Sequence, residues 1–181
     1  MADFKLTATR LDRQRIHTGR TIALDVDRVR LADGHELPIE VVHHLGAVVV
    51  IASDDAGAVI LERQFRYAIG RVLIEAPAGT LHPGEDPLAC AVRELAEETG
   101  YRAREWSSLG AFFTAPGFCD ERIHAFLARG AQPAVERSLD EDEHIEVLTM
   151  APAAIRELVG RGDIEDAKTL AALALAGILA G

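Results

Sequence analysis

Cysteines, aromatic residues and long apolar runs are scarce in this sequence of 181 residues. Cys90 and Cys119 are the only cysteines, and they form neither a metal-ligand spacing nor a disulfide framework. The longest apolar stretch, residues 170–181, spans about 12 residues, whereas a membrane-spanning helix needs roughly 20. The first residues lack the apolar core of a signal peptide. These absences disfavour a disulfide scaffold and favour a cytoplasmic protein without a membrane segment.

Positive charge is also scarce. Lys and Arg number 19 against 29 Asp and Glu, which gives a net charge of −10. A broad nucleic-acid or anionic-membrane partner needs basic patches, so this balance disfavours both classes. It leaves room for a phosphorylated ligand, because bound divalent cations bring polyanions to acidic sites. The apolar share of 49% and the charged share of 27% are those of an ordinary globular protein with a sizeable core.

Residues 1–42 alternate apolar and charged side chains, which is typical of strands with one buried face. Turn signals at residues 17–19 and 32–34 divide this region into a β-meander. A sheet of this size has a small core and exposed edges, so we expect it to pack against another surface. The sequence therefore predicts a small antiparallel N-terminal sheet, followed by a separate domain at residues 43–181.

The domain at residues 43–181 begins with strands, and its run VVVIA is apolar on both faces, as in a central strand. After Gly79 the apolar period changes from that of a strand to that of a helix, with Asp86 as its cap and Gly100 at its end. Strands return after this helix, and two further helices follow them. The predicted helices are 87–99, 152–159 and 163–180. The combination predicts an α+β fold with a mixed sheet.

Three carboxylates are predicted to share one face of the first of these helices. Glu94, Glu97 and Glu98 are spaced three and four residues apart, so they lie on one side. Like charges so close destabilise the helix unless cations neutralise them, and hard oxygen ligands suit Mg²⁺ or Mn²⁺. A loop rich in Gly and Pro, residues 77–79, precedes the helix and can turn a backbone carbonyl toward the same place. The alternative is a solvated acidic face that pairs with arginines.

The stretch from Gly79 to Tyr101 resembles the signature of the Nudix hydrolase family, G-x5-E-x7-R-E-U-x-E-E-x-G-U, where U is a bulky apolar residue. The specified positions are filled by Gly79, Glu85, Arg93, Glu94, Leu95, Glu97, Glu98 and Gly100. Only Tyr101 departs from the pattern, since an aliphatic residue is usual there. The resemblance implies a hydrolase of nucleoside diphosphates linked to another moiety, dependent on Mg²⁺ or another divalent cation such as Mn²⁺, in a Nudix-type α/β/α sandwich.

The resemblance also implies roles for single residues. The implied metal ligands are Glu94, Glu98 and the carbonyl of Ala78. The implied catalytic carboxylates of the signature are Glu97 and Glu98. The implied structural residues are Gly79, Glu85, Arg93 and Gly100, with Glu85 paired to Arg93 so that the helix is held to its loop. Such a metal centre bridges a diphosphate, offsets charge that develops at phosphorus and lowers the pKa of an attacking water.

Features outside the signature resemble one branch of the family, the ADP-ribose pyrophosphatases. Pro116 lies sixteen residues after Gly100 and is followed by Gly117 and Glu121, as in that branch. The resemblance implies that these three residues bind substrate. It also implies a homodimer in which the first sheet crosses to the partner, where Arg28 would reach a neighbouring substrate pocket.

The segment ERQFRYAIGRVLIEAPAG resembles the same branch upstream of the signature. Arg66 is the candidate diphosphate contact, because a planar guanidinium can bind two phosphate oxygens at once. Arg63 is the alternative candidate for this contact. If it does not bind the diphosphate, it is only an exposed residue of the strand. Glu75 either contacts the nucleotide or forms a salt bridge at the strand end. The histidines, among them His43 and His44, are expected to be ordinary strand residues.

An acidic segment at residues 140–147 is the other element that the resemblance singles out. In ADP-ribose pyrophosphatases the matching D-E-x-E-x-I pattern supplies a catalytic carboxylate and an extra metal ligand. This makes Glu141 the candidate general base and Glu143 the candidate ligand, and the two roles are exchangeable because the sequence does not fix the loop register. A carboxylate on such a loop can orient water once substrate is bound. A bare charge run would instead be a solvated, mobile loop.

The leading hypothesis is hydrolysis of ADP-ribose to AMP and ribose 5-phosphate. A pyrophosphatase for another nucleotide sugar, such as GDP-mannose, is the alternative in the same class, because the signature handles only the diphosphate. A non-catalytic Nudix-like sensor is disfavoured by the complete set of signature carboxylates. The last alternative is a dimeric structural protein with a charged surface helix. It predicts that Glu98→Gln leaves any activity untouched, whereas the hydrolase hypothesis predicts a large loss of kcat.

Overall fold

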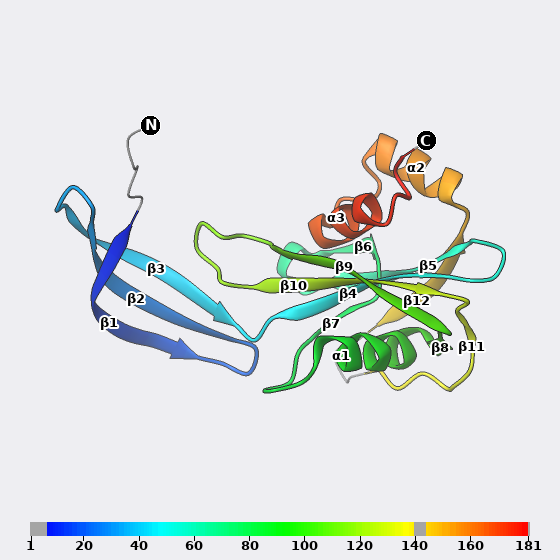
Figure 1. Cartoon of the computed structure of the whole chain (residues 1–181), viewed down its shortest axis with the longest axis horizontal. Helices are drawn as coiled ribbons and strands as arrows, with labels where there is room; N and C mark the ends of the chain where they lie inside the picture. The colour runs from blue at the N-terminus through cyan, green and yellow to red at the C-terminus, as the bar shows by residue number, and fades with distance from the viewer. Residues whose placement is uncertain (1–6, 140–143, 181) are drawn as a thin grey trace. The chain divides into compact units, whose positions relative to one another are not determined.

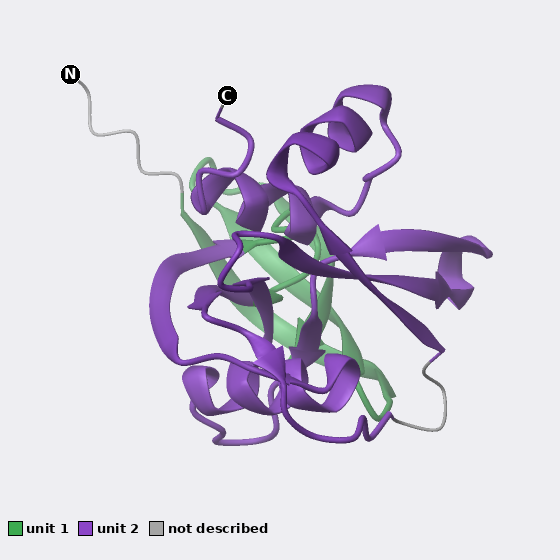
Figure 2. Cartoon of the chain, turned by 90° about the vertical axis from the view of Figure 1, so that its right-hand side faces the viewer, with its two compact units in different colours: residues 1–45, 113–122 green, residues 46–112, 123–181 purple. Residues whose placement is uncertain are grey.

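The computed structural model describes residues 7–139 and 144–180 of the chain. The chain divides into two compact units, one of residues 1–45 and 113–122 and the other of residues 46–112 and 123–181 (Figure 2). No helix in these described stretches is long and apolar enough to cross a membrane.

The first unit contains a three-stranded antiparallel meander with the order β1-β2-β3 (Figure 1). Its strands are β1 (Ala8–Thr18), β2 (Ile22–Leu31) and β3 (Glu36–His44). The turn between β2 and β3 falls at the predicted signal, where Asp33 Oδ1 accepts the His35 N–H at 3.0 Å. The small antiparallel N-terminal sheet that the sequence predicts is therefore confirmed.

Ion pairs fill part of one face of this meander. β2 buries Asp25 and Asp27, which are 0% and 6% exposed. Arg13 of β1 binds Asp27 through two hydrogen bonds of 2.7 and 2.8 Å, and Arg15 binds Asp25. These hydrogen bonds from arginine hold the pKa of both carboxyls below the ordinary aspartate range, against the effect of burial. Paired charges across strands thus replace part of the apolar core that so small a sheet lacks.

The segment at residues 113–122 belongs to this first unit and is held to the end of β3. Asp120 donates its N–H to the Val42 carbonyl at 3.1 Å. His43 lies between two carboxylates, with Nε2 3.0 Å from Asp25 Oδ2 and Nδ1 2.6 Å from Asp120 Oδ2. The expectation of an ordinary strand residue at His43 missed this bridge between the meander and the segment.

The second unit is built on a mixed sheet with the strand order β12-β5-β4-β10-β9, in which β6 also pairs with β5 and β7 with β4 (Figure 1). The strands are β4 (Ala47–Ser53), β5 (Val59–Arg66), β6 (Arg71–Glu75), β7 (Ala78–Thr80), β9 (Glu105–Phe113), β10 (Arg122–Arg129) and β12 (Ile145–Met150). β4 and β10 run parallel, while β5 runs antiparallel to both β4 and β12. β8 (Tyr101–Arg102) and β11 (Gln132–Pro133) form a separate antiparallel pair.

Helices cover both faces of this sheet, α1 on one side and α2 and α3 on the other (Figure 1). Their bounds are α1 (Pro87–Glu94), α2 (Pro152–Arg161) and α3 (Ala167–Leu175). Because successive side chains of a strand point to opposite faces, β4 serves two cores. Val48 and Val50 pack toward α1, whereas Val49 and Ile51 pack toward α2 and α3. This arrangement confirms the predicted α/β/α sandwich with a mixed sheet.

The helix predicted at residues 87–99 has the predicted bounds but differs in type at its end, whereas the helix predicted at residues 163–180 is wrong in extent. The helix predicted at residues 87–99 is α-helical only in its first part and continues as a π-helical turn over Leu95–Thr99. Such turns widen the helix and are frequent at functional sites. The helix predicted at residues 163–180 is shorter at both ends. It begins after Asp166 because that carboxylate caps it by accepting the Thr169 N–H at 2.9 Å.

Candidate active site

The acidic helix is defined here as α1 with its π-helical turn. It is held in place by its cap and by its buried apolar side, independently of its carboxylates. Asp86 caps its first turn, because Oδ1 accepts the N–H groups of Leu88 and Ala89 at 3.0 Å each. Ala91 and Leu95 on its apolar side are fully buried against the sheet. The helix therefore holds its polar side chains on a rigid support.

Arg93 is the centre of the polar contacts on this helix. Its Nε and Nη2 bind Glu85 Oε1 and Oε2 at 3.0 and 3.1 Å, so the structure places Glu85 and Arg93 together. Its Nη1 donates to Glu94 at 2.7 Å and to Glu97 at 2.9 Å. The hydrogen bonds from Arg93 lower the pKa of Glu85 to about 2. One guanidinium thus orients three carboxylates.

Two of the signature carboxylates reach β7. Glu98, which is 2% exposed, accepts the Ala78 N–H through Oε2 at 2.9 Å. Glu94 lies against Gly79 so closely that a Cβ at residue 79 would overlap its carboxylate, so a larger residue there would displace the Glu94 side chain. The contact of Ala78 shown by the structure is made by its N–H, and the role of its carbonyl as a metal ligand stays a prediction. Glu94 and Glu98 are therefore gathered at one short stretch of backbone.

The C-terminal end of the acidic helix is packed against the chain that leads to the acidic segment. Gly100 adopts a φ of 78°, and a Cβ there would lie only 2.8 Å from the Val135 carbonyl, so both geometry and space require glycine. The Ser138 N–H donates to the Glu97 carbonyl at 3.0 Å. The predicted general base and additional ligand, Glu141 and Glu143, lie outside the described residues.

Arg66 and Glu75, both predicted as substrate contacts, bind each other. Arg66 Nε and Nη2 donate to the two oxygens of Glu75 at 2.8 Å each, and Lys168 Nζ also binds Glu75. Burial raises the pKa of the fully buried Glu75, but hydrogen bonds from Arg66 and the charge of Lys168 outweigh burial and hold it below the ordinary range. Arg63 is engaged elsewhere, with Nη1 3.0 Å from Glu146 Oε2.

Lys168 is the residue of this group that sequence reasoning missed. It follows Glu75 by 93 residues, so no local pattern connects the two. The available signal was compositional, since Lys168 is one of only two lysines in a chain where arginine carries the remaining positive charge.

The other predicted substrate contacts lie in the first unit. Glu121 Oε2 accepts the Thr114 hydroxyl at 2.6 Å, and Glu121 Oε1 lies 3.5 Å from His44 Nδ1. Pro116 and Gly117 occupy the turn between these two ends of the segment 113–122. The structure therefore gathers Pro116, Gly117 and Glu121 in one loop, separate in sequence from the signature.

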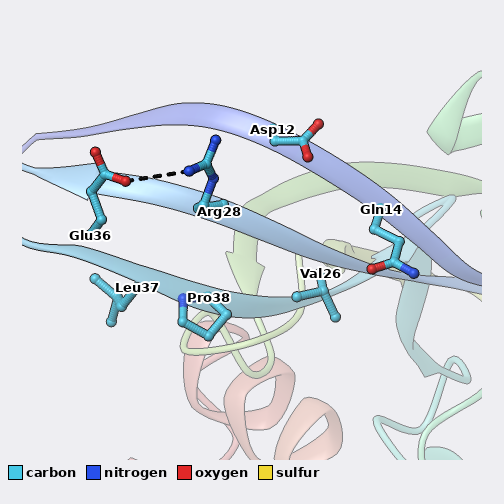
Figure 3. A pocket seen from close by; sticks show the side chains of 7 residues that line it. All are labelled: Asp12, Gln14, Val26, Arg28, Glu36, Leu37 and Pro38. Atoms are coloured by element: carbon cyan, nitrogen blue, oxygen red, sulfur yellow. Dashed lines mark ion pairs between the residues drawn. The ribbon is translucent and has the colours of Figure 1, made fainter.

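Arg28 lines a hollow of about 260 Å³ on the three-stranded sheet (Figure 3). The lining residues are Asp12, Gln14, Val26, Arg28, Glu36, Leu37 and Pro38. Arg28 Nη1 lies 3.6 Å from Glu36 Oε2, the ion pair that Figure 3 marks between these strands. All of the lining residues come from β1, β2 and β3, so the hollow belongs to the first unit.

The donors at the acidic helix suit a hard divalent cation with an open coordination shell. Across residues 7–139 and 144–180, no three His, Cys, Asp or Glu side chains converge to enclose a metal by themselves. Glu94 and Glu98 instead supply two carboxylates beside the backbone of Ala78 and Gly79. Mg²⁺ commonly binds one or two carboxylates, retains waters and takes further ligands from substrate phosphates. The residues present fit a cation held jointly by protein and diphosphate.

Known proteins resemble this chain over most of its length. The family model described as NUDIX domain matches residues 42–173. An ADP-ribose pyrophosphatase of Bacillus subtilis (strain 168) is 43% identical over 162 residues, which cover 89% of this chain and 88% of the relative. An ADP-ribose pyrophosphatase of Mycobacterium tuberculosis (strain ATCC 25618 / H37Rv) is 42% identical over 172 residues, covering 91% and 78%. A GDP-mannose pyrophosphatase of Cronobacter sakazakii (strain ATCC BAA-894) is 41% identical over 133 residues, covering 69% of each.

A solved structure described as an ADP compounds hydrolase shares the fold. The two chains superpose with a TM-score of 0.82, and the match covers 94% of this chain and 92% of the other. Their sequences are 22% identical, so this likeness concerns the fold alone. It agrees with the sandwich architecture predicted from the sequence.

Proposed function

The chain belongs to the Nudix hydrolase family, and we propose that it hydrolyses the diphosphate of ADP-ribose to AMP and ribose 5-phosphate with Mg²⁺ as its cofactor. The observation that carries this proposal is the meeting of the acidic helix with β7. Glu98 accepts the Ala78 N–H at 2.9 Å, and Glu94 fills the space beside Gly79. Two largely buried carboxylates thereby gather at the backbone of β7, where a hard cation has the oxygen donors it prefers.

When bound, Mg²⁺ supplies neutralisation of the diphosphate charge and a lower pKa for the attacking water. Glu94 and Glu98 would hold it, with the Ala78 carbonyl as a further ligand. Arg93 keeps Glu94 in a fixed orientation, and its own position is set by the two hydrogen bonds to Glu85. We expect Mn²⁺ to replace Mg²⁺, because both cations favour carboxylate, carbonyl and water oxygens.

Arg66 supports binding of the diphosphate itself. Glu75 takes the Nε and Nη2 donors of Arg66 and fixes the guanidinium plane, and a diphosphate would be bound through Nη1 and the second N–H of Nη2. Glu141 is the proposed general base and Glu143 the proposed additional ligand. The remaining proposed substrate contacts are Glu75, Arg28, Pro116, Gly117 and Glu121.

The choice of ADP-ribose is supported by two observations that agree. The stretch that contains Pro116 resembles the ADP-ribose branch. The relatives from B. subtilis and M. tuberculosis are both described as ADP-ribose pyrophosphatases, and each matches about nine tenths of this chain. GDP-mannose is the second candidate substrate, because the C. sakazakii relative is nearly as similar over a shorter stretch.

We also propose that the chain acts as a homodimer through its N-terminal sheet, residues 1–42. β1 is an edge strand that is exposed along nearly all of its length, and Ile16 on it is 50% exposed. Exposed edge strands are usually covered or blocked. Sedimentation of the full chain and of Ile16→Asp tests this, with a dimer that weakens in the variant as the expected result and a monomer in both as the contradicting one.

The substrate proposal is tested by incubating the chain with ADP-ribose or GDP-mannose, with Mg²⁺ or with EDTA, and quantifying the nucleotide and sugar phosphate formed. Release of AMP and ribose 5-phosphate, abolished by EDTA and faster than cleavage of GDP-mannose, is the expected result. Preferred cleavage of GDP-mannose would keep the chemistry and overturn the substrate. Tight ADP-ribose binding without cleavage would favour a nucleotide sensor instead.

A further inference from the structure

The first turn of α3 is tied to the strand end that leads into β7. Lys168 Nζ binds Glu75 Oε2, and Thr169 Oγ1 accepts the Ala76 N–H at 2.8 Å. Thr169 is fully buried, and the side chain of Lys168 is only 15% exposed. The C-terminal helix thus contacts the stretch of chain just before the candidate metal site through two separate polar bonds, one buried and one partly buried.

Asp166 organises both ties. Its Oδ2 accepts the Thr169 N–H at 2.9 Å and the Thr169 hydroxyl at 2.6 Å, and it lies 3.0 Å from Lys168 Nζ. Because the hydroxyl proton is donated to Asp166, the Thr169 oxygen is left to accept from Ala76, which fixes the direction of each hydrogen bond. Asp166, Lys168 and Thr169 therefore form one interlocked group, named here the α3 clamp.

The α3 clamp acts on residues that lead directly to the acidic helix. Ala76 is followed by Pro77, whose carbonyl accepts the Val50 N–H at 2.9 Å, and then by Ala78, whose N–H binds Glu98 at 2.9 Å. Residues 75–77 are buried, so this short stretch has no room to move independently of its neighbours. A displacement at the clamp is therefore transmitted to the backbone that meets the carboxylates.

We propose that the α3 clamp sets the position of residues 76–79 and with it the geometry of the metal site, with Lys168 and Thr169 as positioning residues. This inference rests on the proposed function, because the metal site is part of that proposal. Outer partners that orient ligands commonly change metal affinity by about 10–100-fold when they are removed. Neither residue is a proposed ligand of the metal or a proposed contact of the substrate.

Two pairs of variants isolate the clamp. Thr169→Val removes the hydroxyl and keeps the shape, whereas Thr169→Ser keeps the hydroxyl. Lys168→Met removes the ammonium at similar length. Its control is Arg71→Met, which removes the exposed ion pair between Arg71 and Glu165 at 2.7 Å. Arg71 is the first residue of β6 and Glu165 lies two residues before α3, so this contact also joins β6 to the chain beside α3.

Two measurements without substrate read out the effect. Mn²⁺ binding, followed by electron paramagnetic resonance, is expected to weaken by about tenfold or more in Thr169→Val and Lys168→Met. Amide hydrogen exchange of the metal-free protein is expected to accelerate at residues 76–80 in the same two variants. Thr169→Ser and Arg71→Met are expected to keep wild-type values in both measurements. Wild-type values in Thr169→Val would overturn the inference. If Lys168→Met does not fold, the comparison of Thr169→Val with Thr169→Ser is sufficient to test the inference.

The failure of this inference is distinguishable from the failure of the proposed function. Wild-type protein that cleaves no ADP-ribose would contradict the proposed function, while faster exchange in Thr169→Val would still support the clamp. Active wild-type protein with unchanged exchange and Mn²⁺ affinity in the variants would overturn the clamp alone.

Discussion

The acidic helix of the second unit and the meander of the first unit both carry clusters of charged side chains, but their balance of charge differs. On the acidic helix, one guanidinium, that of Arg93, binds the carboxylates of Glu85, Glu94 and Glu97. In the meander, two buried carboxylates meet an excess of basic groups. These are Asp25 and Asp27, with Arg10, Arg13, Arg15 and His43 around them.

The difference separates a structural cluster from one that suits a ligand. A buried carboxylate surrounded by hydrogen-bonded cations is already compensated, and removing one partner of such a pair is what destabilises the fold. The carboxylates at the acidic helix outnumber the one guanidinium that binds them, so negative charge remains that a divalent cation would offset. The meander cluster therefore holds strands together, and the cluster on the acidic helix is the one we connect to catalysis.

The largest expected effect comes from Glu98→Gln. This change removes a proposed metal ligand, so we expect kcat for ADP-ribose to fall by about two orders of magnitude or more with the fold intact. Steady-state kinetics measures the change in kcat, and circular dichroism checks that the fold is intact. Glu157→Gln, an exposed change on α2, is the control and should keep wild-type kcat. Near-normal turnover in Glu98→Gln would contradict the mechanism.

A loss of similar size is expected for the general base. Glu141→Gln should lower kcat strongly while changing substrate binding less, because a base acts on the reacting water rather than on the bound substrate. The matched variant Glu143→Gln should mainly weaken metal binding. Kinetics of both variants over a range of Mg²⁺ concentrations separates the roles, and the reverse pattern would show that the two roles are exchanged.

A smaller effect concerns stability with and without metal. The proposed ligands of Mg²⁺ come together only in the folded chain, so adding Mg²⁺ should raise the unfolding temperature of the wild-type protein. Thermal unfolding should show the same rise in Asp27→Asn, whose meander cluster is weakened, and no rise in Glu98→Gln. If Asp27→Asn lost the response to Mg²⁺, this would contradict the claim that the meander cluster has no part in metal binding.

The smallest expected effect is a pH dependence that arises from Glu85. Its pKa is about 2 in the folded chain against an ordinary value of 4.5, so the folded state favours the ionised form. A carboxyl whose folded pKa is lowered adds stability that is complete above its unfolded pKa and is lost as the pH falls toward the folded value. Urea unfolding between pH 5 and pH 2 should therefore show a shallower loss of stability in Glu85→Gln than in wild type. Parallel curves would contradict this.

The sequence predicted those features that depend on residues close together along the chain. The cap at Asp86 and the end of the acidic helix at Gly100 lie within one short stretch, so propensity and spacing were sufficient for both. The pairing of Glu85 with Arg93 was implied by the resemblance to the Nudix signature. The α+β class with a mixed sheet followed from periodicity, because β4 is apolar on both faces and the meander alternates. The α/β/α sandwich was implied by the resemblance to the Nudix family.

The features that sequence reasoning missed depend on distant contacts. Lys168 meets Glu75 across 93 residues, and His43 meets Asp120 across 77. Asp25 looked like a solvent-facing charge in an alternating strand, whereas arginines from the neighbouring strand allow it to be buried. Pairing partners of this kind are fixed by tertiary packing, which local patterns do not encode.

Metal-dependent catalysis is tested by the rate of AMP release from ADP-ribose by wild-type protein that has been stripped with EDTA and then titrated with Mg²⁺. We expect no AMP without metal and a rate that rises with Mg²⁺ to a plateau. AMP release at an undiminished rate in EDTA would contradict metal-dependent catalysis.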